Sequence, residues 1–163
     1  MRRLPLLALL IAAPAAHAQE AVRIAAPQSP ISASVEVPAG SRLVYVSGTV
    51  PDPVDEAAPP GSVARFGDTA AQTRSILRKI QAQLRQHHMD LKDIVMMRVF
   101  LVAPPGQEAM DFAGMMTGYR EFFGTAEQPN RPARSTMEVS GLVDPGWLVE
   151  IEVTAAGPPG ESR

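Results

Sequence analysis

The 163-residue chain contains no cysteine and few aromatic residues, which make up 5% of the sequence. Without thiols it can have no disulfide bond, no cysteine nucleophile and no zinc site of the cysteine type. An excess of charge is also missing, because 15 Lys and Arg stand against 17 Asp and Glu, for a formal net charge of −2. The chain therefore lacks the basic footprint of a nucleic-acid-binding protein.

Several signature motifs are absent as well. The sequence has no Gly-rich phosphate loop, no Gly-x-Ser-x-Gly elbow, no nucleotide-binding fingerprint and no internal repeat. Proline is plentiful instead, with 16 residues that cluster near the start, in residues 51–60, around 104–105 and in the tail. These clusters separate the expected elements of one domain.

The first eighteen residues have the pattern of a secretory signal. Met1–Arg3 is basic, Leu4–Ala13 is apolar, and Ala16-His17-Ala18 has the small-x-small form of a cleavage site. An uncleaved anchor is the alternative, but a spanning helix needs roughly 20 apolar residues and this run is shorter. We expect cleavage after Ala18, a secreted or periplasmic protein without a membrane attachment, and a mature net charge of about −4.

Hydrophobic periodicity and turn residues predict the order of the elements. A loose lead-in is expected over residues 19–30 and a disordered tail over 157–163. Between them the patterns predict strands at 32–37 and 43–48, a loop at 51–66, a helix from 69 to about 87, a strand at 94–102, a helix at 107–123, and strands at 131–139 and 147–153. The order β-β-α-β-α-β-β indicates one α+β domain over residues 31–156, with a mixed sheet and both helices on one face.

The first long helix has two possible N-terminal caps. Thr69 and Gln72 fit a capping box, and Asp68 is the competing N-cap. Apolar side chains then recur at three- and four-residue spacing, as expected for a helix with one buried face; they are Ile76, Leu77, Ile80 and Leu84.

An arginine on an expected strand is the first candidate for ligand binding. Arg134 lies in an alternating segment, and Thr136 shares its strand face by period two. A guanidinium can hold a carboxylate with two parallel hydrogen bonds, so a small acid is the expected ligand. Arg131 is a nearby competitor, and a structural ion pair at a subunit interface is the alternative role of Arg134.

The second candidate is a carboxylate on the last strand. Glu150 and Glu152 share one face of that strand, and a carboxylate can move a proton or hold a water. Glu152 and Glu138 are more simply read as solvated or ion-paired residues. Gly48 ends the second strand, where a glycine lets a ligand approach the backbone or simply permits a turn.

Together these segments resemble the Rid family, also called the YjgF family, of reactive-intermediate deaminases. The resemblance runs from about residue 28 to 156. Its motifs are Leu43–Pro51, Asp68–Val102 with Gln72-Thr73, Tyr119–Phe123, Pro132–Ser135 and Val149–Val153. It implies a chorismate-mutase-like fold, a homotrimer with ligand clefts between subunits, and hydrolysis of 2-imino or enamine acids to 2-keto acids and ammonia. It implies neither a metal nor an organic cofactor.

The resemblance also assigns roles to single residues. Arg134 matches the arginine that binds the substrate carboxylate, and Glu150 matches the glutamate that positions or activates water. Ile31, Met116 and Thr136 stand where relatives often have tyrosine, asparagine and cysteine. These changes indicate a bulkier or more hydrophobic substrate, or else an exported small-acid-binding protein that has lost catalysis on the same scaffold.

Two other features are given structural interpretations. His87 and His88 are adjacent on a helix end and point about 100° apart, which does not suit a shared metal. The methionines are expected in the core and interfaces, with copper binding as the alternative. An RNA-directed activity, suggested for some relatives of this family, is disfavoured by the acidic mature chain.

Overall fold

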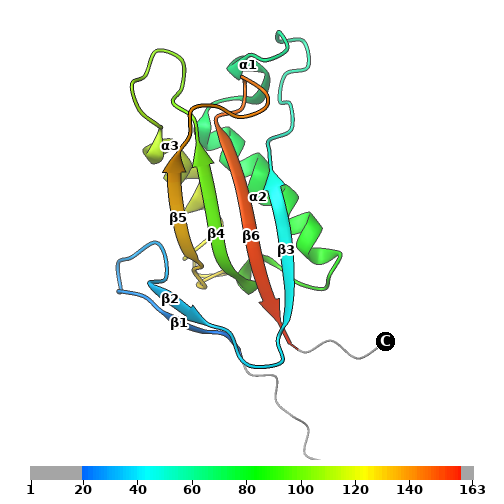
Figure 1. Ribbon diagram of the computed structural model, residues 1–163, viewed down its shortest axis with the longest axis vertical. Helices are drawn as coiled ribbons and strands as arrows, with labels where there is room; N and C mark the ends of the chain where they lie inside the picture. Colours follow the sequence, from blue (N-terminus) through cyan, green and yellow to red (C-terminus); the bar gives the residue numbers. More distant parts are fainter. Residues whose placement is uncertain (1–19, 159–163) are drawn as a thin grey trace, which may run out of the picture.

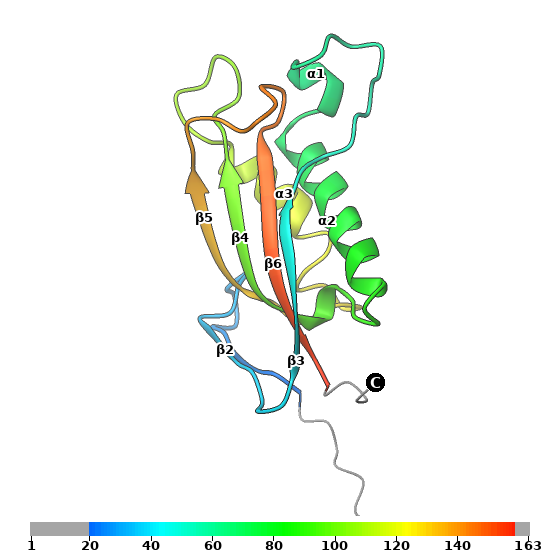
Figure 2. The same ribbon diagram turned by 45° about the vertical axis from the view of Figure 1, so that its right-hand side comes forward.

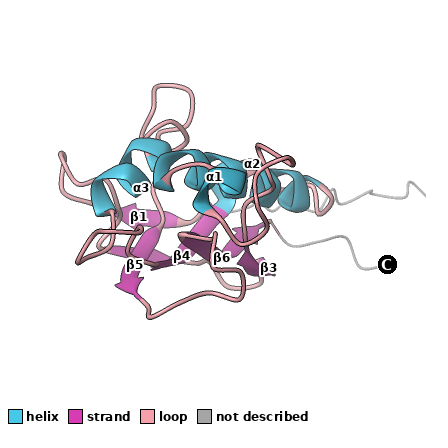
Figure 3. Ribbon diagram, turned by 90° about the horizontal axis from the view of Figure 1, so that it is seen from above, coloured by secondary structure: helices cyan, strands magenta, loops and turns pink. Residues whose placement is uncertain are grey.

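The protein is a mixed four-stranded sheet with its helices packed on one face, as a computed structural model describes it for residues 20–158 (Figures 1 and 3). The expected signal, residues 1–18, and the last five residues of the expected tail lie outside the described range. In that range no helix has the length and apolar character that a membrane crossing requires.

The sheet has the order β3-β6-β4-β5. Strand β6 runs antiparallel to both β3 and β4, whereas β4 and β5 are parallel neighbours joined through a helix. The elements are β1 (Val22–Ile24), β2 (Ser34–Glu36), β3 (Arg42–Thr49), α1 (Val63–Phe66), α2 (Thr69–Arg85), η1 (Leu91–Asp93), β4 (Ile94–Leu101), α3 (Phe112–Tyr119), β5 (Ala133–Glu138) and β6 (Val149–Gly157). The predicted mixed sheet with helices on one face is confirmed.

The core lies between the sheet and helices α2 and α3, which lie side by side over it (Figure 2). Strand β6 alternates strictly, so that Val149, Ile151, Val153 and Ala155 are buried and the residues between them are half-buried. The apolar stripe of α2 faces this row, and its four predicted core residues have no exposed surface. No helix of residues 20–158 lies on the opposite face of the sheet.

A glycine brings the two helices together. A Cβ atom at Gly118 in α3 would lie 2.8 Å from the Ala70 carbonyl oxygen and 2.8 Å from the Thr73 Cβ of α2. Any side chain there would push α3 away from α2, and α3 carries part of the site described below.

The capping-box prediction for α2 is wrong, and its competitor is right. Asp68 is the N-cap and accepts a hydrogen bond from the Ala71 amide. Gln72 is fully buried instead; its amide nitrogen donates to the Gly67 and Gly146 carbonyls, and its oxygen accepts from the Leu148 amide. The side chain thus holds the loop that leads into β6, a long-range contact that local spacing cannot reveal.

Four boundaries differ from the sequence expectation. The lead-in over residues 19–30 contains β1, which pairs with β2 in a separate two-stranded sheet, so the expected first strand lies outside the main sheet. Residues 63–66 of the expected loop form α1. Helix α3 is shorter than predicted because Asp111 caps its start, accepting from the Gly114 amide. The tail begins later, since Gly157 still belongs to β6.

We expect Gln72→Leu to lower the free energy of unfolding by about 3 kcal/mol, because two carbonyls and an amide would be left buried without partners. Urea denaturation would measure the loss. Gln83→Leu on the same helix is the matched control, since Gln83 is exposed and makes no side-chain hydrogen bond among the described residues. Equal stability of the two variants would contradict the role given to Gln72.

Candidate functional site

Arg134 projects from the edge strand β5 toward helix α3. It pairs with Met97 of β4, whose side chain is fully buried under the helices, so Arg134 points to the helix-covered side of the sheet. Its Nη2 atom lies 3.1 Å from the Met116 sulfur and its Nη1 atom 3.9 Å from the Met115 sulfur. The guanidinium carbon is 4.4 Å from the centre of the Tyr119 ring. Thioether sulfurs are weak acceptors, so these two contacts satisfy the guanidinium N–H donors only weakly.

The charge of Arg134 is not neutralised by any acidic group in the described part of the chain. None of the ion pairs among residues 20–158 includes Arg134, although the side chain is part-buried. Burial lowers the pKa of this guanidinium, an electrostatic interaction with Tyr119 acts in the opposite direction, and the charge of Arg120 adds to the lowering. The ordinary value is so high that the group stays charged near neutral pH. A part-buried cation without an anion is suited to binding a negatively charged ligand.

Thr136 adds a free hydroxyl on the same side of β5. It pairs with the buried Val99, so it shares the face of Arg134, as its spacing predicts. Its Oγ1 atom is buried and has no hydrogen-bond partner among the described residues. Buried hydroxyls usually have a partner, so Thr136 contributes an unsatisfied polar atom on the same face as Arg134.

The other two predicted wall residues lie beside the arginine. Met116 touches it directly, through the sulfur contact given above. Ile31 is held nearby, because hydrogen bonds fix the residues before and after it. The Pro30 carbonyl accepts from the Tyr119 hydroxyl, and the Ser32 amide donates to the Pro132 carbonyl just before β5. The structure therefore brings Arg134, Thr136, Met116 and Ile31 together.

Glu150 and Gly48 form a second group on the opposite face. Glu150 pairs with Phe100 across β4 and β6, in the row that the helices do not cover. A Cβ atom at Gly48 would overlap the Glu150 Oε1 atom, so any other residue there would force this carboxylate to move. The register between β3 and β6 shifts between Val46 and Thr49, which places Gly48 at an irregularity of the strand. Glu150 has no ion pair among the described residues.

The two groups do not meet within one chain. Arg134 and Glu150 point to opposite faces of the sheet, and β4 runs between their strands. Glu152 shares the face of Glu150 but is occupied, because its Oε1 atom lies 2.5 Å from the Arg98 Nη1 atom. The ion-paired interpretation of Glu152 is therefore confirmed.

Sequence reasoning missed the two aromatic rings of α3 that lie next to the Arg134 guanidinium. The sequence assigned Tyr119 to a family motif and Phe112 only to the expected helix at 107–123, whereas the structure places the Phe112 ring centre 5.9 Å from the Arg134 guanidinium carbon. The signal was present in the spacing, because Phe112, Met115 or Met116, and Tyr119 recur every three to four residues on one side of α3.

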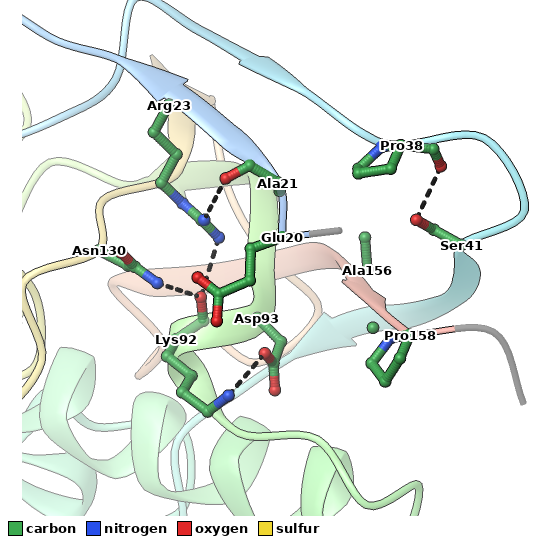
Figure 4. A pocket seen from close by; sticks show the side chains of 11 residues that line it. Glu20, Ala21, Arg23, Pro38, Ser41, Lys92, Asp93, Asn130, Ala156 and Pro158 are labelled. Carbon is green, nitrogen blue, oxygen red and sulfur yellow. Dashed lines mark hydrogen bonds and ion pairs between the residues drawn. The ribbon is translucent and has the colours of Figure 1, made fainter. Parts of the chain in front are cut away.

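A hollow of about 270 Å³ lies at the other end of β6, lined by charged groups (Figure 4). Its part-buried arginine, Arg23, is already used: the guanidinium donates to the carbonyls of Ala21, Lys92 and Ile94 and so ties β1 to the start of β4. Lys92 pairs with Asp93 beside it. The charges of this hollow mainly join segments of the chain.

Metal binding finds no support in the described part of the chain. Residues 20–158 contain no group of three or more His, Asp or Glu side chains that could hold an ion. His87 and His88 are exposed just beyond the end of α2, and His88 has a positive φ of 56° that turns the chain away from the helix. The pair therefore lies at a helix end, as its sequence position indicates.

Comparison with known proteins places the chain in a family. The family model described as Endoribonuclease L-PSP matches residues 23–157. The 3-aminoacrylate deaminase RutC of Acinetobacter baylyi is 34% identical over 126 residues, which cover 77% of this chain and 88% of the relative.

Solved structures agree in fold. A crystal structure of YyfB of the Rid protein family from Yersinia pestis has a TM-score of 0.63 at 22% identity and covers 85% of this chain and 99% of that one. The structure of E. coli TdcF with bound serine has a TM-score of 0.55 at 26% identity, over 74% of this chain and 84% of that one. The chain therefore belongs to the Endoribonuclease L-PSP family, which is the Rid/YjgF family that its sequence motifs indicated.

Proposed function

We propose that the protein hydrolyses 2-imino or enamine acids to 2-keto acids and ammonia. The observation that carries this proposal is the part-buried guanidinium of Arg134, which has no anion among the described residues and lies beside the unpartnered hydroxyl of Thr136. A carboxylate would complete this site. The RutC relative, a 3-aminoacrylate deaminase, supports the same class of reaction.

In the proposed reaction Arg134 holds the substrate carboxylate and Glu150 positions water. An enamine first takes a proton at carbon and loses one from nitrogen, which gives the imine. The water oxygen then bonds to the imine carbon, and Glu150 takes a water proton and passes it to the nitrogen. The C–N bond of the resulting carbinolamine breaks, its hydroxyl proton leaves with ammonia, and a carbonyl remains. An imine carbon is already electrophilic, so positioning and one proton carrier suffice.

Because Arg134 and Glu150 face opposite ways in one chain, we propose that each site forms between two copies, as in the trimer that the family implies. The face without helices has exposed apolar side chains, at Leu43, Tyr45 and Met137, which a second copy could cover. Strands β3 and β5 are the two edges of the sheet. In this arrangement β5 of one copy brings Arg134 toward Gly48 and Glu150 of the next.

The proposals on cellular location and on the kind of ligand rest on the leader pattern and on the net charge. The leader pattern of residues 1–18 supports export to the periplasm or medium. The family model bears the name of an endoribonuclease, but the negative net charge of this chain favours a small acid over RNA as the ligand.

A second candidate is a small-acid-binding protein without catalysis. The observation that favours it is the apolar surround of the arginine, where Met116 sulfur replaces the polar side chain common in relatives. It would bind 2-keto acids through Arg134 and leave imines unchanged.

Arg134→Ala and Glu150→Ala should each lower the rate of imine hydrolysis about 100-fold or more, because one removes carboxylate binding and the other proton transfer. An amino-acid oxidase would generate 2-imino acids of small, branched and aromatic side chain, with semicarbazide to trap what remains. Glu138→Ala is the control, since Glu138 is exposed on β5 and has no ion pair among residues 20–158. Wild-type inactivity on every imino acid, with intact keto-acid binding, would favour the binding protein.

Gly48→Ala should lower activity about tenfold or more with little loss of binding, because its Cβ would displace the Glu150 carboxylate and spare Arg134. Gly141→Ala is the matched control, because a Cβ there meets nothing within 4 Å. Kinetics of both variants would be compared with keto-acid affinity. Unchanged turnover in Gly48→Ala would remove Glu150 from the proposed role.

Mixing the two inactive variants tests whether sites form between copies. If Arg134 and Glu150 come from different chains, co-refolded Arg134→Ala and Glu150→Ala proteins should regain about a quarter of wild-type activity by random assembly into closed rings. Differently tagged chains would be purified as mixed oligomers and assayed. No recovery in verified mixed oligomers would place both groups in one chain's site, against the proposal.

A further inference from the structure

Tyr119 lies directly under the arginine of the proposed site. The Arg134 guanidinium carbon is 4.4 Å from its ring centre, a distance at which a cation is attracted to an aromatic face. The tyrosine is 1% exposed, and the Phe123 ring stacks on it at 4.6 Å between centres and 17° between planes. The ring under Arg134 is therefore fixed by the core of the protein.

The hydroxyl of Tyr119 fixes the ring at its far end. It donates to the Pro30 carbonyl at 3.0 Å, which also ties the segment around Ile31 to α3. Burial raises the pKa of this phenol to about 12, although Arg134 and Arg131 act in the opposite direction. The phenol thus remains neutral and keeps its donor hydrogen near neutral pH. The Tyr119 ring is thus held by the stacked Phe123 ring and by the hydrogen bond of its own hydroxyl, and it carries no charge.

A carboxylate under Arg134 would also hold the guanidinium, but at a cost to ligand binding. It would occupy the N–H donors and compete with an incoming acid. An aromatic face and thioether sulfurs attract the cation yet leave its donors without oxygen partners. The arginine can therefore be ordered before the ligand arrives, which reduces the entropy lost on binding.

We propose that Tyr119 is a positioning residue that orders Arg134 for the substrate carboxylate without consuming its hydrogen-bond donors. This inference rests on the proposed function, because it assigns a part in that same site. Since the carboxylate is bound equally before and during the reaction, loss of Tyr119 raises KM and the Kd for keto acids, while kcat changes little.

The test compares two buried aromatic residues that stack on each other. Tyr119→Leu removes the ring in contact with Arg134, whereas Phe123→Leu removes its neighbour and leaves the contact in place. We expect Tyr119→Leu to weaken binding of 2-oxobutanoate, measured by calorimetry, about tenfold, and Phe123→Leu less than about twofold. Thermal melts of both proteins would show whether the two losses of core packing are comparable.

Variants that keep an aromatic ring at position 119 test the same role without the loss of core packing that could unfold the protein. Tyr119→Phe retains the aromatic face and should bind within about threefold of wild type. Phenylalanine analogues with increasing numbers of fluorine atoms can replace Tyr119. Fluorine withdraws electron density from the ring face and changes the shape of the ring little. Affinity should then fall stepwise with each fluorine, which a purely structural role of the ring does not require.

The outcomes separate this inference from the function on which it rests. If wild-type protein binds 2-oxobutanoate and Arg134→Ala does not, the acid site stands. Equal affinities of Tyr119→Leu and Phe123→Leu, or a flat fluorine series, would then overturn the role of Tyr119 alone. If wild-type protein does not bind the keto acid, the acid site and this inference both fall.

Discussion

Strand β6 imposes the constraint on which the rest of the structure depends. Its alternate residues are buried beneath α2 and α3, and the intervening ones lie on the face that has no helix. Because β6 pairs with both β3 and β4, its register determines which residues of those strands point toward the helices. The buried row builds the core, and the other row carries Glu150 and Glu152. A shift of one residue would exchange these rows and remove the core.

This constraint also determines where chemistry can occur. Glu150 belongs to the uncovered row, where Gly48 leaves space for its carboxylate. Arg134 belongs to the covered side at the sheet edge, where α3 supplies an aromatic ring and two sulfurs. A single chain therefore carries on different faces the arginine that we propose to bind the acid and the glutamate that we propose to carry the proton. Assembly of copies along the edges of the sheet is the arrangement that we propose to unite them.

The surroundings of Arg134 explain how a charged group can be both buried and available. A salt bridge would stabilise it but would also occupy it, whereas the contacts around it leave its N–H donors without oxygen partners. The same surroundings are more apolar than the resemblance to the family alone implies, because Met116 stands at a position that relatives often fill with asparagine. Family membership and the RutC relative support a deaminase-type role, and we propose that these local replacements set the side-chain preference for the substrate.

Much of the fold and part of the site could be predicted from the sequence. The alternation of β4 and β6, the apolar stripe of α2, and the shared faces of Arg134 with Thr136 and of Glu150 with Glu152 follow from local periodicity, which each segment carries by itself. The tertiary structure alone decided the contacts between segments that are distant along the chain. These include the Tyr119 ring under Arg134, the hydrogen bonds of Gln72 to the loop before β6, the small β1–β2 sheet and the opposite facing of Arg134 and Glu150. Periodicity says which residues share a face, but the pairing of strands and the packing of helices determine what that face meets.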